Sequence, residues 1–122
     1  MKRTLSGAIL LSLALMSCQV QEKPTLTGNY NVIPLPQEIT VVEGEAFTIT
    51  DGTAIVYKGD EAMKRNAEHL SAYIKHATGL ELEVTATEKE NSITLAVEEL
   101  GENSEAYRLT VDGKGVNITG DT

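Results

Sequence analysis

A chain of 122 residues has room for one domain but not for a (β/α)₈ barrel, which needs roughly 250 residues. It holds 18 acidic and 10 basic residues, and the net charge of −8 argues against binding nucleic acid through a basic surface. With four Tyr, one Phe and no Trp, it lacks the aromatic content typical of a dedicated sugar-binding module. Four side chains remain as candidates for stacking on a sugar: Tyr30, Tyr57, Tyr73 and Tyr107.

The amino terminus has the pattern of a secretion signal that ends in a cysteine. A short basic stretch at residues 1–4 precedes an apolar run at residues 5–16, which is shorter than the ~20 residues that a membrane-spanning helix needs. The run ends in Leu15-Met16-Ser17-Cys18, which resembles the lipobox of bacterial lipoproteins, with Met16 as a slight departure from its usual residues. This resemblance implies that residues 1–17 are removed and that Cys18 carries the lipid.

The lipoprotein interpretation predicts a protein of the bacterial cell envelope, held to a membrane by Cys18 and facing the periplasm or the outer surface. Because Cys18 is the only cysteine, an internal disulfide and a two-cysteine metal site are excluded. The alternative is an ordinary signal peptide followed by a chance cysteine. Residues 18–31 are polar and have no periodicity, which is expected of a tether between the lipid and a domain.

The domain itself is predicted to span residues 32–122 and to begin with strands. Residues 33–36 are expected to be extended, because two prolines restrict the backbone there. Apolar residues at 38–43 and 46–50, separated by a glycine, predict a β-hairpin, and a third strand is expected at 53–58. Together these segments would form a strand meander.

Residues 60–78 change to a helical period. Their apolar residues advance by four, three, four and three positions, which places them in one stripe along a helix. Asp60 is suited to cap the amino end, and Gly79 is suited to the left-handed conformation that often ends a helix. The stripe consists of Met63, Ala67, Leu70, Ile74 and Ala77.

After the helix, apolar and polar residues alternate again, which predicts strands with one apolar face. The alternating runs lie at residues 80–86, 93–97, 107–111 and 116–118, and residues 112–115 have the composition of a hairpin turn. Strands with a single apolar face favour a sheet covered on one side. The predicted fold class is therefore α+β: a mainly antiparallel or mixed sheet with one long amphipathic helix at about 60–78 packed on one face, as a two-layer sandwich.

Several of these segments occur together in one known family. From residue 32 to 122 the chain resembles the amino-terminal domain of glycoside hydrolase family 20, the β-N-acetylhexosaminidases. The hairpin at 105–120 is the most specific part of the resemblance. The segments that carry it are IPLP at 33–36, EGEAFTI at 43–49, AEHL at 67–70, TG at 78–79, EAYRLTV at 105–111 and GVNITG at 115–120.

The resemblance implies a zincin-like accessory domain that packs beside the catalytic barrel of a hexosaminidase. In the family, the chain next runs through an Ala-Gly-x-Phe-Tyr-Gly helix and enters the barrel, so the barrel is the expected partner and lies outside this sequence. We accordingly expect a non-catalytic accessory domain of a lipid-anchored enzyme that removes terminal N-acetylhexosamine. Two alternatives remain open: a stand-alone small lipoprotein that binds glycans or a protein partner, and an anchoring module without a ligand.

An adjacent acidic pair in the chain invites comparison with the family's catalytic pair. Family 20 enzymes use an Asp to orient the substrate's 2-acetamido group and a neighbouring Glu to protonate the leaving oxygen, in a substrate-assisted mechanism. Asp60-Glu61 lacks the His-x-Gly-Gly-Asp-Glu context of that pair and stands where the helix begins. We therefore interpret Asp60 as a helix cap and expect no catalytic residue in this chain.

Metal and cofactor sites are not expected either. His69 and His76 are seven residues apart, about 10.5 Å along a helix, which is too far for one zinc ion. Asn117 opens a glycosylation sequon inside a predicted strand, where the match is attributed to chance. Substrate-binding residues are left unassigned. Four carboxylates lack the spacing of a calcium loop and are interpreted as a solvated turn: Glu98, Glu99, Glu102 and Glu105.

Overall fold

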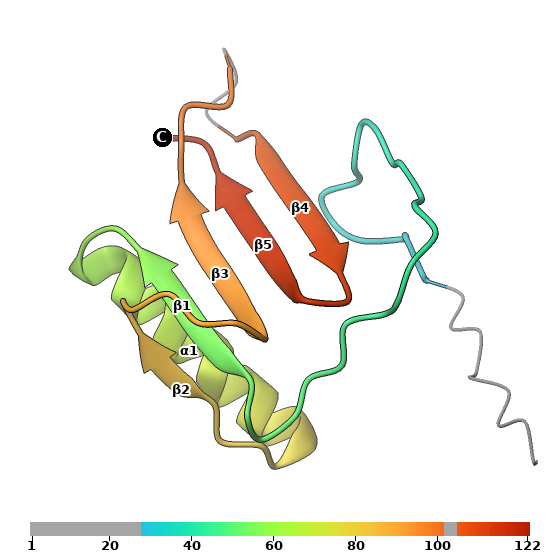
Figure 1. Ribbon diagram of the computed structural model, residues 1–122. Coiled ribbons are helices and arrows are strands. Elements are labelled where there is room, and N and C mark those ends of the chain that lie inside the picture. The colour runs from blue at the N-terminus through green and yellow to red at the C-terminus, as the bar shows by residue number, and fades with distance from the viewer. Residues whose placement is uncertain (1–27, 102–104) are drawn as a thin grey trace, which may run out of the picture. The chain divides into compact units, whose positions relative to one another are not determined.

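The computed structural model describes residues 28–101 and 105–122 (Figure 1). The predicted signal, Cys18 and most of the tether therefore lie outside the described residues. Contacts divide the chain into two units, Met1–Tyr30 and Asn31–Thr122, and the fold described below is that of the second. Its elements are β1 (Ala54–Lys58), α1 (Glu61–Thr78), β2 (Glu83–Thr85), β3 (Ser92–Val97), β4 (Tyr107–Asp112) and β5 (Gly115–Gly120).

The five strands form one mixed sheet in the order β2-β1-β3-β5-β4. Strand β1 pairs in parallel with β2 and β3, β3 pairs in parallel with β5, and β4 and β5 form an antiparallel hairpin. The α+β class and the mixed sheet are confirmed, but parallel pairing is the more frequent kind, whereas the sequence favoured antiparallel pairing. The cause is topological, because α1 returns the chain so that β2 can lie parallel to β1.

Helix α1 begins and ends as its capping residues predict. The Asp60 carboxylate accepts hydrogen bonds from the backbone N–H groups of Ala62 at 2.9 Å and Met63 at 3.1 Å. At the other end Gly79 adopts the left-handed conformation, with φ of 80°, and its N–H donates to the carbonyl of Lys75 at 2.8 Å. These caps supply partners for backbone groups that a helix end otherwise leaves unpaired.

The hydrophobic core lies between α1 and one face of the sheet. Ala67 and Ile74 of α1 are buried against Ile55, Ile93 and Leu95 of the central strands, with Leu82 beside them. The strand register carries apolar side chains across the whole sheet in rows on this face. One row runs through Val84, Ile55, Ile93, Val116 and Val111, and the next through Tyr57, Leu95, Ile118 and Leu109.

The predicted hairpin at residues 38–50 is wrong. The structure has irregular backbone from residue 36 to residue 50, and its first strand is β1, within the third strand predicted at 53–58. Phe47 packs partly against the core, while Ile39 and Val41 remain exposed. Alternation supplies an apolar face, but a strand forms only where the backbone pairs with a neighbouring strand, as it does in β4 although the residues of β4 are exposed. Residues 38–50 take no part in the sheet.

Candidate functional site

The acidic pair Asp60-Glu61 stands at the amino end of α1. The Asp60 carboxylate is used in the cap, and Glu61 is exposed, 3.8 Å from the amine of Lys64. The negative charge of Glu61 in the first turn also complements the helix dipole. Both side chains therefore have local roles in the helix.

The other candidate residues do not gather into one site. His69 and His76 are both exposed on α1, Glu98 and Glu99 follow β3, and Asn117 lies on β5. Glu102 and Cys18 fall outside the described residues. Across residues 28–101 and 105–122, no three His, Cys, Asp or Glu side chains are grouped to hold a metal ion. Over the same ranges, no helix is both long and apolar enough to cross a membrane.

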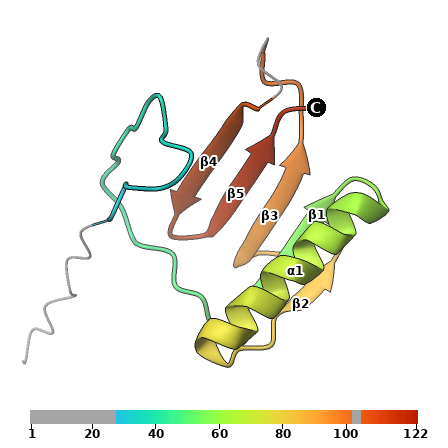
Figure 2. The ribbon, with the colours of Figure 1, turned by 180° about the vertical axis from the view of Figure 1, so that it is seen from behind.

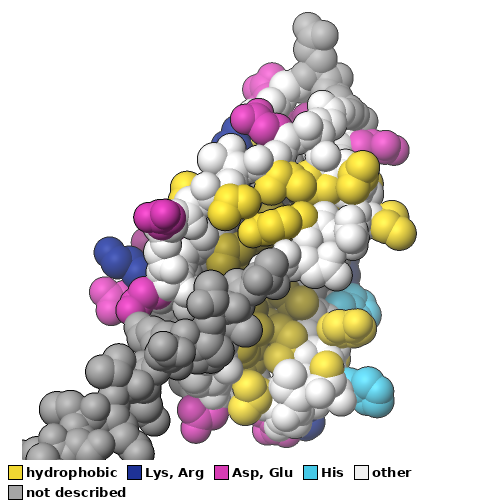
Figure 3. All heavy atoms as spheres, turned by 90° about the vertical axis from the view of Figure 1, so that its right-hand side faces the viewer, with side chains coloured by type: hydrophobic (Ala, Val, Ile, Leu, Met, Phe, Trp, Pro, Cys, Tyr) yellow, Lys and Arg dark blue, Asp and Glu magenta, His cyan; other side chains and the backbone are white. Residues whose placement is uncertain are grey.

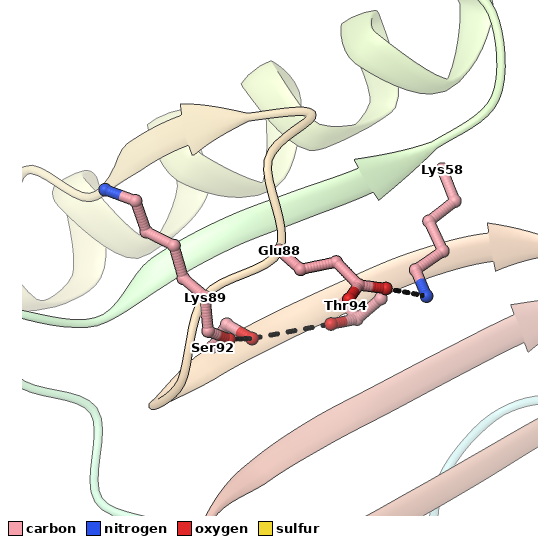
Figure 4. A network of polar contacts seen from close by, with 5 residues as sticks. All are labelled: Lys58, Glu88, Lys89, Ser92 and Thr94. Carbon is pink, nitrogen blue, oxygen red and sulfur yellow. Dashed lines mark hydrogen bonds and ion pairs between the residues drawn. The ribbon is translucent and has the colours of Figure 1, made fainter.

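A groove of about 800 Å³ lies on the face of the sheet opposite α1. Val56, Thr94 and Asn117 line it from three neighbouring strands, and residues 88–91 and 112–115 line it from a loop and a turn. The chain passes from β2 to β3 through residues 86–91. This loop brings residues 88–91 to the face of the sheet opposite α1 (Figure 4). Sequence reasoning missed this groove, because it depends on β2 and β3 lying on opposite sides of β1.

Two ion pairs hold the loop at the groove. The amine of Lys58 on β1 contacts the Glu88 carboxylate at 2.8 Å, and Lys89 pairs with Glu83 of β2. The hydrogen bond and charge of Glu88 raise the pKa of the Lys58 amine, and Lys58 lowers the pKa of the Glu88 carboxyl. Figure 4 shows this pair together with Ser92, whose hydroxyl donates to the Lys89 carbonyl at 2.8 Å.

The groove offers hydrogen bonds but no stacking surface for a sugar. Its lining is polar and charged around the buried Val56, and no aromatic residue takes part in it. The tyrosines considered for sugar binding lie elsewhere: Tyr57 packs against the core, Tyr73 is exposed on α1, and Tyr107 stands on β4, where its hydroxyl donates to the Pro34 carbonyl at 2.9 Å. Tyr30 belongs to the first unit.

On the face that carries α1, the helix covers only part of the sheet. It contacts β1, β2 and β3, and it contacts neither β5 nor β4 (Figure 2). Figure 3 faces the β4 side and shows hydrophobic side chains gathered across the upper middle of this face, with the two histidines at its right-hand edge. We call the apolar surface beyond the helix the uncovered half-sheet; it consists of Val97, Tyr107, Leu109, Val111, Val116 and Ile118.

The uncovered half-sheet continues the rows of the core without the helix above them. Leu109 is 53% exposed and Val111 is 47% exposed, while Val116 and Ile118 on the neighbouring strand are half-buried. Exposed apolar residues are ordinary one by one, but a contiguous group aligned across strands is typical of a surface that another polypeptide covers. Among the features described, this surface has the strongest physical indication of a function.

Comparisons with known proteins agree with this fold. Residues 29–122 match glycosyl hydrolase family 20, domain 2. Among solved structures, the chain is similar to the GH20 β-N-acetylhexosaminidase from Streptomyces coelicolor A3(2), with 32% identity and a TM-score of 0.67. That match covers 76% of this chain and 18% of the Streptomyces protein, so the chain spans less than a fifth of that relative. No curated protein matches. The chain belongs to glycosyl hydrolase family 20 and carries domain 2 of that family over residues 29–122.

Proposed function

We propose that this chain is the accessory domain of a lipid-anchored β-N-acetylhexosaminidase that hydrolyses terminal N-acetylhexosamine residues. The observation that carries the proposal is the match to domain 2 of family 20 over residues 29–122, supported by the likeness to a hexosaminidase of known structure. That match covers 18% of the Streptomyces enzyme, which supports a larger protein in which the catalytic barrel is the partner of this domain.

The domain's own role is non-catalytic. The family's reaction requires an acidic pair that reaches the substrate's acetamido group and the glycosidic oxygen. In this chain the adjacent pair Asp60-Glu61 is placed at a helix start, with Asp60 engaged by backbone N–H groups. The groove on the open face also lacks the aromatic surface that would favour the alternative of a stand-alone glycan-binding lipoprotein.

The proposal is tested with the enzyme that contains this domain, using an aryl N-acetyl-β-glucosaminide as substrate. We expect the intact enzyme to release the aryl group and the Glu61→Gln variant to keep the same kcat, because Glu61 takes no part in the reaction. Loss of kcat in the Glu61→Gln variant, with its thermal stability unchanged, would place the chemistry in this domain. An intact enzyme without activity on any N-acetylhexosaminide would refute the assigned reaction.

Lipid attachment is proposed from the sequence Leu15-Met16-Ser17-Cys18. Its physical consequence is a protein held to the cell envelope through the thioether at Cys18. Bacteria expressing the chain are fed an alkyne-bearing fatty acid, and incorporation is read on a gel after coupling to a dye. We expect labelling of the native chain and none of the Cys18→Ser variant. Equal labelling of both, or of neither, would contradict the lipoprotein assignment.

A further inference from the structure

We draw no further inference here: the strongest candidate, the polar groove between residues 88–91 and 112–115 on the sheet face opposite α1, carries nothing, because no buried polar side chain across residues 28–101 and 105–122 is left without a hydrogen-bond partner and nothing in the structure indicates what would bind there.

Discussion

The two halves of the helix-bearing sheet face have the same kind of residues and different surroundings. Leu95 and Leu109 lie in the same row across the sheet, yet Leu95 is 8% exposed and Leu109 is 53% exposed. Helix α1 lies over the strands near Leu95 and does not contact β4. The strand pattern provides an apolar face, and the element packed above that face determines whether it becomes a core.

The largest expected effect comes from truncating the two leucines in the 122-residue chain. Leu95→Ala should lower the free energy of unfolding by about 2–5 kcal/mol, because it leaves a cavity under the helix. Leu109→Ala should cost about 1 kcal/mol or less, since half of its side chain is already in water. Urea unfolding followed by circular dichroism measures both. Equal costs would show that the two halves are buried alike.

The helix that creates the covered half can be weakened at its amino end. Asp60→Ala should lower the free energy of unfolding by about 1 kcal/mol, because two backbone N–H groups lose their acceptor. Asp60→Asn keeps an acceptor at the cap and serves as the matched control. Thermal unfolding compares the three proteins. A cap substitution without effect would indicate that α1 adds little stability to the sheet beneath it.

The smallest effect is expected on the opposite face, at the ion pair of Lys58 and Glu88. Lys58 lowers the pKa of the Glu88 carboxyl, so the stabilising contribution of this group is present above its ordinary pKa of 4.5 and is lost as the pH falls through the lowered value. The raised pKa of Lys58 acts at the alkaline end, where its contribution disappears as the pH rises through that value. Both side chains are exposed, so the effect is small and screened by salt.

This pH dependence is measured by urea unfolding of the native chain and of the Glu88→Gln variant, at neutral pH and near pH 3 in low salt. We expect the native chain to be slightly more stable at neutral pH and the difference to shrink in acid. A difference that grows as the pH falls would have the wrong sign for this ion pair. Glu90→Gln is the control on the same loop, because it removes a neighbouring carboxylate and leaves the ion pair of Lys58 and Glu88 in place.

Sequence patterns predicted the local features well. The helical period of α1 and its two capping residues depend on residues close together in the sequence. The alternating runs located β2, β3, β4 and β5 to within a few residues. The hairpin at 105–120 was also correct, because its turn lies within the segment itself. These features depend on short-range interactions, which can be predicted from the pattern of residues in one segment.

Features set by long-range pairing were not predicted. Parallel pairing of β1 with β2 and β3 follows from where the helix returns the chain. The strands predicted at 38–50 do not form, because that segment pairs with no strand of the sheet. The groove at residues 88–91 and the uncovered half-sheet depend on the same arrangement. The candidate surface was therefore visible in the sequence only as apolar residues at 107–111, without any sign that the helix misses them.

The most direct test of the account compares Leu109→Ala with Leu95→Ala in the intact enzyme. If the remaining polypeptide covers the uncovered half-sheet, Leu109 is a core residue there, and its truncation should cost about 2–5 kcal/mol, as large as that of Leu95→Ala. The measured quantity is the change in free energy of unfolding of this domain, followed by hydrogen exchange of the β5 amides. A Leu109→Ala cost that stays near or below about 1 kcal/mol in the intact enzyme would contradict the account.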